Sequence, residues 1–392
     1  MSPKTGIPEL DYRWIDNEDA LEEVVESLCA TDAFALDTEF HRERTYYPKL
    51  ALIQIAWDDD LVLIDPLEVD VAPLARAITS AGTCVMHAAQ QDLEVLYRAC
   101  GTVPSHIFDT QIAAGFVGLS TPSLSTLVER FLDMRLPKGD RLTDWMQRPL
   151  NAAQRNYAAS DVAFLLQIKD MLSADLGERG RLGWVVDECE GFRTRPQGDA
   201  DAADAWMKIK EARHLRGTAR GCASTLAAWR ENTARSTDQP VRFVLSDLAL
   251  VGIAQKAPTD VDGLKKIRGL DGRHLRNGAG DEILAAVRTG KDVPSKSLDR
   301  GGADTSAQLE RRLRPAVTLV SAWISQVARD EALDPAQLAT RADIIDYLAG
   351  EPSARLRTGW RHEIAGARIS GLVDGELALA FDGGELVLVD RT

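Results

Sequence analysis

Apolar residues fall into short blocks along the first sixty-five positions. Leu50–Trp57 is almost continuously apolar and rich in β-forming residues, and Asp58-Asp59-Asp60 separates it from a second block, Leu61–Ile64. Apolar blocks bounded by turn residues predict paired strands. Together with the apolar stretch Ala33–Leu36 they predict three antiparallel strands, with the acidic triplet as a hairpin turn rather than a metal cluster.

Beyond residue 71 the pattern alternates between helix and strand. It predicts a helix to about Ser80, a strand at Thr83–Met86, a helix at Gln90–Ala99, a strand near Ile107 and helices through Phe131. A helix over Asn17–Cys29 precedes these elements, and a helical run from Asn151 to about Leu176 follows them. Mixed strands flanked by helices indicate an α/β sheet whose polar ligands lie at strand and helix ends.

Two polar linkers divide the rest of the chain. One runs from about Thr194 to Asp204 and the other from Ser295 to Thr305. Between them the predicted elements are short amphipathic helices at Ala205–Arg216, Gly221–Thr233, Ser246–Ala254 and Asp281–Thr289. The expected domains are therefore residues 1–194, 205–292 and 303–392.

The last hundred residues begin with a long predicted helix through Leu313 and Ile324, followed by a helix at Ala342–Leu348. Two apolar runs then flank Asp382-Gly383-Gly384, a pattern that predicts a terminal β-hairpin. No phosphate-binding Gly-x-x-x-x-Gly-Lys-Ser/Thr motif is present, which excludes a helicase motor in this sequence.

Composition fits a soluble globular protein of two or three domains. The chain has 392 residues, of which 45% are hydrophobic and 27% charged. No apolar run is long enough to span a membrane, and Met1–Gly6 lacks the apolar core of a secretory signal, so we expect a cytoplasmic protein without a membrane partner. The five cysteines form no Cys-x-x-Cys pair, which argues against a thiolate zinc site or a disulfide framework.

The net charge of −14 would repel nucleic acid if it were spread evenly. It is not, because residues 206–290 hold 15 Lys and Arg against 9 Asp and Glu, a local balance of +6 that leaves −20 elsewhere. This segment includes Lys265, Lys266 and Arg268. Either it is a basic nucleic-acid-binding module, or its cations only solvate a helical surface.

Asp37 and Glu39 follow the first predicted strand and are separated by one residue, so both carboxylates should point to the same face. Neighbouring carboxylates repel unless a proton or a cation neutralises them. Mg²⁺ and Mn²⁺ prefer oxygen ligands and share them with substrate phosphates. Taken alone, so common a pair is better explained by a strand end at which Asp37 begins a turn and Glu39 is solvated.

Two further stretches favour a metal site. Asp92 lies near the start of the helix that follows Thr83–Met86, and Tyr157 and Asp161 lie four residues apart in the helical run that begins at Asn151. A spacing of four places two side chains on one helix face. Four acids and a tyrosine thus come from three separate elements, as expected when a fold gathers ligands for two metal ions.

Three motifs resemble those of ribonuclease D, a member of the four-carboxylate exonuclease superfamily whose third motif carries a tyrosine. They are Asp37-Thr-Glu39-Phe40, the run from Tyr46-Tyr47-Pro48-Lys49-Leu50 to Gln54, and Trp145-Met-Gln-Arg148-Pro149-Leu150 followed by Gln154, Tyr157 and Asp161. The motifs cover the first half of the chain in the family's order. The resemblance implies a ribonuclease H-like exonuclease fold, and the second segment resembles the helicase and ribonuclease D C-terminal (HRDC) domain, with residues 303–392 as a diverged second copy.

The resemblance also implies a function and a set of site residues. The expected activity is two-metal-ion 3′-to-5′ hydrolysis of RNA ends such as those of tRNA precursors, with release of nucleoside 5′-monophosphates by a monomer. Two Mg²⁺ or Mn²⁺ ions about 3.5–4 Å apart would be held by the four acids, while Tyr157 orients the water. The expected substrate contacts are Thr38, Phe40, Gln54, Lys138, Arg148, Lys265, Lys266 and Arg268.

Two other functions remain open from the residues. A DNA exonuclease would use the same metal chemistry, because no residue of the sequence identifies a contact to the 2′-OH that distinguishes RNA. A binding scaffold with an inactive site is a different class of protein. The full set of four acids and Tyr157 argues against it, because binding alone does not need them.

Overall fold

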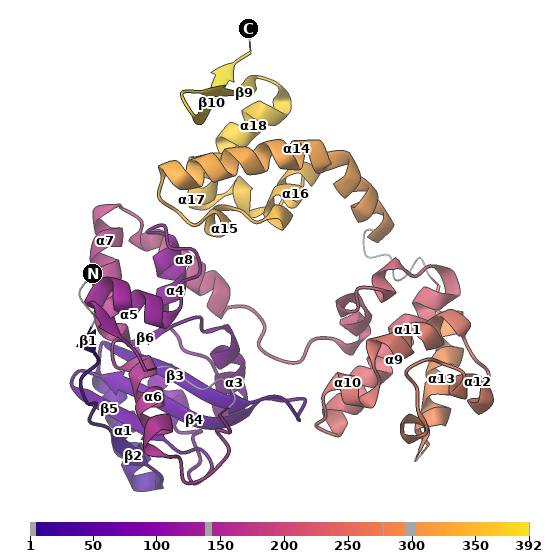
Figure 1. Cartoon of the computed structure of the whole chain (residues 1–392), viewed down its shortest axis with the longest axis horizontal. Coiled ribbons are helices and arrows are strands. Elements are labelled where there is room, and N and C mark those ends of the chain that lie inside the picture. Colours follow the sequence, from indigo (N-terminus) through magenta and orange to yellow (C-terminus); the bar gives the residue numbers. More distant parts are fainter. Residues whose placement is uncertain (1–4, 138–142, 277, 295–302, 392) are drawn as a thin grey trace. The chain divides into compact units, whose positions relative to one another are not determined.

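A computed structural model describes residues 5–137, 143–276, 278–294 and 303–391 (Figure 1). The chain forms two compact units. The sheet unit comprises residues 1–40, 50–197 and 310–392, and the helical unit comprises residues 41–49 and 198–309. Among the described residues, no helix is long and apolar enough to cross a membrane.

A six-stranded mixed sheet is the centre of the sheet unit. Its strands are β2 (Arg13–Ile15), β3 (Ala33–His41), β4 (Lys49–Trp57), β5 (Asp60–Ile64), β6 (Thr83–Met86) and β7 (Ile107–Asp109), in the spatial order β2-β5-β4-β3-β6-β7. β4 and β5 pair antiparallel around the Asp58-Asp59 turn, whereas β3 pairs parallel with β6. The prediction of a mixed α/β sheet is thus confirmed.

Helices cover both faces of this sheet. The helices α1 (Glu18–Ala30), α2 (Leu74–Ile78) and α3 (Gln90–Cys100) pack on the face formed by Phe34, Leu36 and Ile53. The opposite face is covered by α4 (Thr110–Gly115), α5 (Leu124–Leu132), α6 (Ala152–Val162), α7 (Leu165–Glu178) and α8 (Leu182–Arg193). A short parallel pair, β1 (Thr5–Gly6) with β8 (Met134–Arg135), lies outside the main sheet.

The predicted helical run from Asn151 to Leu176 is two helices, because α6 ends at Val162 and α7 begins at Leu165. Asn151 caps α6 by accepting a hydrogen bond from the backbone N–H of Gln154, whose side chain accepts from the backbone N–H of Asn151. This reciprocal pair satisfies two donors at the helix start and fixes the register of α6.

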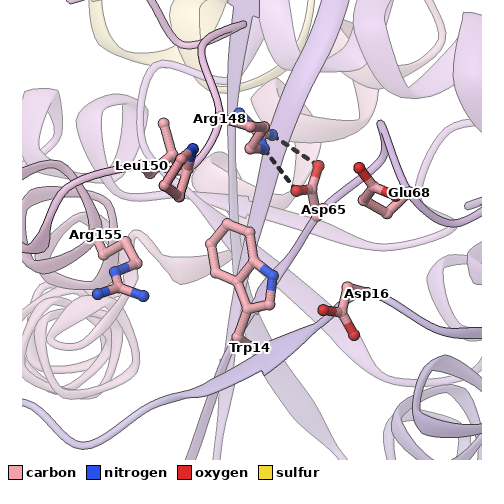
Figure 2. A pocket seen from close by; sticks show the side chains of 8 residues that line it. Trp14, Asp16, Asp65, Glu68, Arg148, Leu150 and Arg155 are labelled. Atoms are coloured by element: carbon pink, nitrogen blue, oxygen red, sulfur yellow. Dashed lines mark hydrogen bonds and ion pairs between the residues drawn. The ribbon is translucent and has the colours of Figure 1, made fainter.

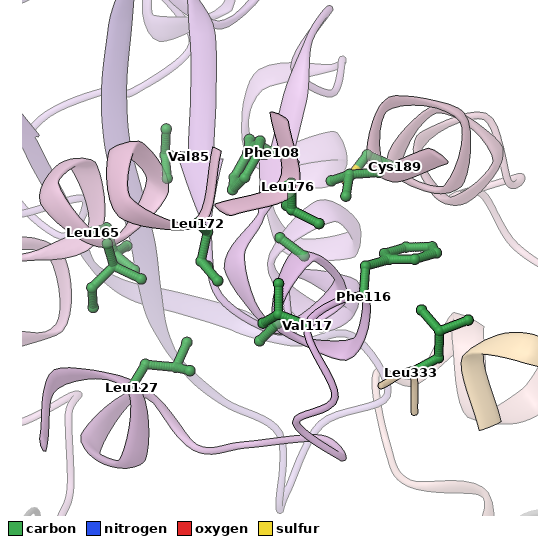
Figure 3. Close-up of a cluster of buried hydrophobic side chains, with 14 of the residues drawn as sticks. Val85, Phe108, Phe116, Val117, Leu127, Leu165, Leu172, Leu176, Cys189 and Leu333 are labelled. Carbon is green, nitrogen blue, oxygen red and sulfur yellow. The ribbon is translucent and has the colours of Figure 1, made fainter. Parts of the chain in front are cut away.

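The C-terminal segment packs onto the sheet unit. It contains α14 (Ala303–Asp330), α15 (Pro335–Leu338), α16 (Arg341–Ala349), α17 (Gly359–Arg361), α18 (Ala367–Asp374) and the antiparallel hairpin β9 (Leu377–Asp382) and β10 (Glu385–Asp390). Figure 3 shows Leu333 of this segment beside Phe116 in the shared core. Trp360 stacks on Trp184 with ring centroids 5.0 Å apart. The predicted terminal hairpin is confirmed.

The helical unit is built around α9 (Gly217–Ser236) and α13 (Ala279–Asp292), with α10 (Val241–Val244), α11 (Asp247–Lys256) and α12 (Val261–Lys265) beside them. A side chain at Gly221 would place its Cβ 2.2 Å from the carbonyl oxygen of Gly290, so glycine lets α9 and α13 approach closely. The helix predicted at Ala205–Arg216 is wrong, since Ala202–Lys208 and Ala212–His214 are separate 3₁₀ turns.

Candidate active site

Strand β3 carries the first two acids. Phe34 and Leu36 face α1–α3, whereas Ala35 contributes to the opposite core. Because side chains alternate along a strand, Asp37 and Glu39 lie on the face of Ala35, toward the layer that contains α6. The predicted shared face of the two carboxylates follows from this packing.

Asp92 reaches the same edge of the sheet from α3. Parallel pairing of Ala35 with Val85 sets the ends of β3 and β6 side by side, and the chain leaving β6 enters α3 two residues before Asp92. Asp92 is 7% exposed, and its Oδ1 accepts a hydrogen bond of 2.5 Å from the hydroxyl of Thr38. Thr38 therefore holds a carboxylate in place and is itself almost fully buried.

Helix α6 brings Tyr157 and Asp161 to the acids on β3. The Tyr157 hydroxyl is hydrogen-bonded to the Asp161 carboxylate, as the four-residue spacing predicts. Trp145 packs against Tyr157 with ring centroids 6.1 Å apart. The tyrosine is thus held from both sides, by an aromatic ring and by a carboxylate.

The four acids lie near enough to one another for their charges to interact, although no three of them are close enough to hold one ion as they stand. Burial raises the pKa of Asp37 well above its usual range, and the nearby charges of Asp92, Asp161 and Glu39 raise it further. Burial, followed by the charges of Asp161 and Asp92, raises the pKa of Glu39 to about 8. Among the described residues, no Lys or Arg lowers either pKa, so repulsion in this partly buried site is not compensated by their charges.

The other two acids are also perturbed. Burial raises the pKa of Asp161 to about 7, against the lowering effect of its hydrogen bond with Tyr157. Burial raises the pKa of Asp92 to about 6, against the hydrogen bond from Thr38. Burial and the charge of Asp161 raise the pKa of the Tyr157 phenol, so at neutral pH it is a neutral hydrogen-bond donor.

Asp109 supports this site and was not predicted. It is 1% exposed, caps α4, and accepts hydrogen bonds from the backbone N–H groups of Ala88 and Ala89. Ala88 has a φ of 55°, a conformation that needs such support. Asp109 thereby fixes the turn that starts α3 and positions Asp92. The sequence signal that could have identified Asp109 is an acidic residue between the strand predicted near Ile107 and the helix that follows it.

The Arg148 side chain has a structural role, because other groups of the protein bind its guanidinium. Its Nε and Nη2 donate to the two oxygens of Asp65 at 2.6 and 2.7 Å, and its other contacts are the carbonyl oxygens of Ala51, Trp145 and Gln147. These bonds use all five donors of the guanidinium. The predicted contact of Arg148 with a phosphate is therefore not favoured by its surroundings.

Figure 2 shows the Arg148–Asp65 pair at the wall of an open cavity of about 300 Å³. Trp14 and Arg155 also line it, and the Nε of Arg155 is buried without a hydrogen-bond partner. None of the four acids lines this cavity, so it is separate from the candidate site.

The remaining predicted substrate contacts differ in accessibility. Phe40 is half-buried, and Gln54 is fully buried with neither side-chain amide atom hydrogen-bonded. Lys138 lies outside the described residues. In the helical unit Lys265, Lys266 and Arg268 are exposed, and Lys265 pairs with Asp262 at 2.9 Å. Their roles toward a substrate stay predictions.

Comparisons with known proteins agree with this geometry. Residues 12–177 match the model of a 3′-5′ exonuclease family, and residues 219–287 match that of the HRDC domain. The fold and the acidic site therefore define a 3′-5′ exonuclease joined to an HRDC domain.

The chain is 36% identical over 367 residues to the ribonuclease D of Jannaschia species strain CCS1, covering 91% of this chain and 93% of the relative. It is 33% identical over 374 residues to the Escherichia coli ribonuclease D, covering 93% and 99%. The crystal structure of the E. coli enzyme has a TM-score of 0.82 at 32% identity, covering 93% of this chain and 99% of that chain. The chain belongs to the ribonuclease D family and is a 3′-5′ exoribonuclease.

Proposed function

We propose that Asp37, Glu39, Asp92 and Asp161 hold two divalent cations, Mg²⁺ or Mn²⁺, and that the enzyme releases nucleoside 5′-monophosphates from RNA 3′ ends. The single observation that supports this best is that four carboxylates from β3, α3 and α6 lie near one another in a partly buried site, where their charges raise the pKa values of Asp37 and Glu39. Carboxylate oxygens are the ligands that these hard cations prefer. Two cations would offset this negative charge, which no Lys or Arg of the described ranges offsets.

The four carboxylates are chemically suitable ligands for such ions, but their positions in the structure are not those of a complete metal site. Across the described ranges, no group of three or more acidic, histidine or cysteine side chains is arranged closely enough to hold an ion as it stands. Metal binding would therefore require the carboxylates to move closer together. Asp37 and Glu39 share one strand, and the charge of Asp161 on α6 acts on both of them.

When bound, the cations supply an acidified water and stabilise the leaving 3′ oxygen. The protein's own residues then position the reactants. The neutral Tyr157 hydroxyl, which donates its proton to Asp161, accepts a hydrogen bond from the attacking water and orients it, because its raised pKa excludes a phenolate general base near pH 7. Thr38 keeps the Asp92 carboxylate aligned, and Trp145 keeps the Tyr157 ring in place.

The substrate proposal is RNA with a single-stranded 3′ end, such as a tRNA precursor. The HRDC match covers the basic segment, and the E. coli structure is described as an exoribonuclease involved in structured RNA processing. We place Lys265, Lys266 and Arg268 on the RNA phosphates, acting in a cytoplasmic monomer. Residues 1–194, 205–292 and 303–392 are the proposed domains, although the third packs with the first.

A 3′-end-labelled RNA digestion tests the proposal. Wild-type protein with Mg²⁺ or Mn²⁺ should release labelled mononucleotide, and EDTA should stop the release. Asp161→Ala is the matched inactive variant. Release without added metal in chelator would contradict the metal proposal, whereas equal cleavage of a matched DNA strand would contradict the RNA preference. Binding without any cleavage would identify an inactive scaffold.

A further inference from the structure

The connection between β3 and β4 belongs to the helical unit rather than to the sheet unit. The chain leaves the sheet unit after Phe40 and re-enters it at Leu50. The nine residues His41–Lys49 run from the last residue of β3, the strand that carries Asp37 and Glu39, to the first residue of β4. Any contact that fixes this connection therefore also constrains β3, the strand that carries two of the four acids.

The side chain of Tyr46 in this connection is bound by the C-terminal half of α9. The Tyr46 hydroxyl donates to Glu231 at 2.6 Å and accepts from the Nε of Arg235 at 3.0 Å. Arg235 also lies over the Tyr46 ring, 5.7 Å from its centroid. Glu231 is 6% exposed, so the tyrosine hydroxyl and Arg235 are what compensate a buried carboxylate.

The Asp238 side chain binds the backbone of the same connection. Its Oδ1 accepts from the backbone N–H groups of both Tyr46 and Tyr47, each at 3.1 Å. Asp238 has a φ of 47°, a conformation uncommon outside glycine. The Tyr47 hydroxyl donates to Asp199 at 2.9 Å, and the two tyrosine rings meet edge to face with centroids 4.7 Å apart.

We propose that this docked connection is a tether that makes the enzyme selective for RNA long enough to be held by the helical unit. Tyr46, Glu231 and Asp238 are its positioning residues. The docked connection links the helical unit, which we propose binds the RNA, to Asp37 and Glu39 through the few residues that follow them in the chain. A dinucleotide, which reaches only the acidic site, gains nothing from the tether. The inference rests on the proposed function.

The test compares two substrates with the full-length protein. Wild-type, Tyr46→Phe and Asp238→Ala proteins are assayed with Mn²⁺ on a 5′-phosphorylated dinucleotide and on a hairpin RNA with a single-stranded 3′ tail. Tyr46→Phe removes only the hydroxyl that Glu231 and Arg235 bind. We expect kcat/KM on the hairpin RNA to fall about tenfold, the loss typical of one buried, charge-assisted hydrogen bond, with dinucleotide cleavage unchanged.

Two controls separate the tether from a general loss of structure. Tyr97→Phe removes the hydroxyl of a tyrosine that is 41% exposed on α3. It should leave kcat/KM unchanged for both substrates. Glu231→Gln keeps an acceptor for Tyr46 and should retain more hairpin selectivity than Glu231→Ala. An equal loss on both substrates, or no loss on either, would overturn the tether.

A second measurement does not depend on activity. The connection contains the trypsin sites Arg42 and Arg44, and cleavage there requires the segment to detach locally. Tyr46→Phe and Asp238→Ala should be cut in this connection several-fold faster than wild type, and equal rates would contradict the docking. If wild-type protein cleaves neither substrate with metal, the proposed function fails, while the proteolysis still decides whether the connection is docked.

Discussion

Two groups of acids lie partly buried in the sheet unit, and their surroundings differ. Asp37 and Glu39 meet other acids, and their pKa values are raised. Glu188 on α8 is instead bound by Arg361 and Arg355, whose hydrogen bonds and charges outweigh burial and lower its pKa. Burial disfavours the charged form in both places, but within the part of the chain that the structure describes only Glu188 is compensated by Arg side chains.

The comparison distinguishes a candidate metal site from a structural contact between two segments of the chain. Glu188, Arg355 and Arg361 come from the exonuclease helices and the C-terminal segment, and their pairing holds the two together. A stable fold has no need to bury uncompensated carboxylates, and their desolvation is unfavourable. The unpaired group is therefore where an external cation is expected.

The largest expected effect is on catalysis. Asp161→Asn keeps the size of the side chain but removes a proposed metal ligand, so turnover in Mg²⁺ or Mn²⁺ should fall at least about a hundredfold, because even indirect supports of metal ligands cost 10–100-fold. Labelled-RNA digestion measures this. Asp170→Asn, at an exposed position of α7, is the control. Near wild-type activity of Asp161→Asn would remove the acids from the mechanism.

The paired group should respond in stability instead. Arg361→Met leaves Glu188 with only Arg355 and should destabilise the fold by about 3 kcal/mol, the range for breaking a buried ion pair. Urea unfolding measures the change. Arg179→Met, which breaks an exposed pair with Asp175, should cost about 0.5 kcal/mol or less. If the two substitutions lowered the free energy of unfolding equally, Arg361 would not be a residue that stabilises the packing of the C-terminal segment.

Tyr157→Phe sharpens the assignment within the acidic site. The substitution keeps the ring beside Trp145 and removes the hydroxyl, so kcat should fall about 10–100-fold, while the affinity for Mn²⁺ stays unchanged. Single-turnover kinetics and Mn²⁺ titration measure the two quantities separately. A weakened Mn²⁺ affinity with normal kcat would make Tyr157 a support of Asp161 rather than a residue that orients the water.

The smallest expected effect is the pH dependence of stability without metal. A carboxyl whose folded pKa is raised binds its proton more tightly in the folded state, so stability falls as pH rises from the unfolded value toward the folded one. For Glu39 this window runs from the usual value near 4.5 to about 8. Glu39→Gln removes the titration, and its Tm should exceed that of wild type by a few degrees at pH 8 and match it at pH 4.

Mg²⁺ provides the control for that experiment. Adding it at pH 8 should raise the Tm of wild-type protein more than that of Glu39→Gln, because the ion binds the deprotonated site. A wild-type Tm that rises between pH 5 and 8 relative to Glu39→Gln would contradict the assigned direction of the pKa shift.

The sequence by itself determined most local structure and the identity of the acidic site. Period-two and helical patterns place β3–β6 and α3, and the Tyr-x-x-x-Asp spacing places Tyr157 and Asp161 on one face of α6. These features depend on residues near one another in the chain, where backbone geometry decides which side chains share a face.

Only the tertiary structure decided which polar residues are already committed to partners. Arg148 looks like a phosphate contact in sequence, but Asp65, 83 positions away, engages it. Asp109 supports the start of α3, and Asp238 binds the backbone of Tyr46 from 192 positions away. Hydrogen bonds between distant segments leave no periodic signal, because they depend on where the folded chain brings its segments together.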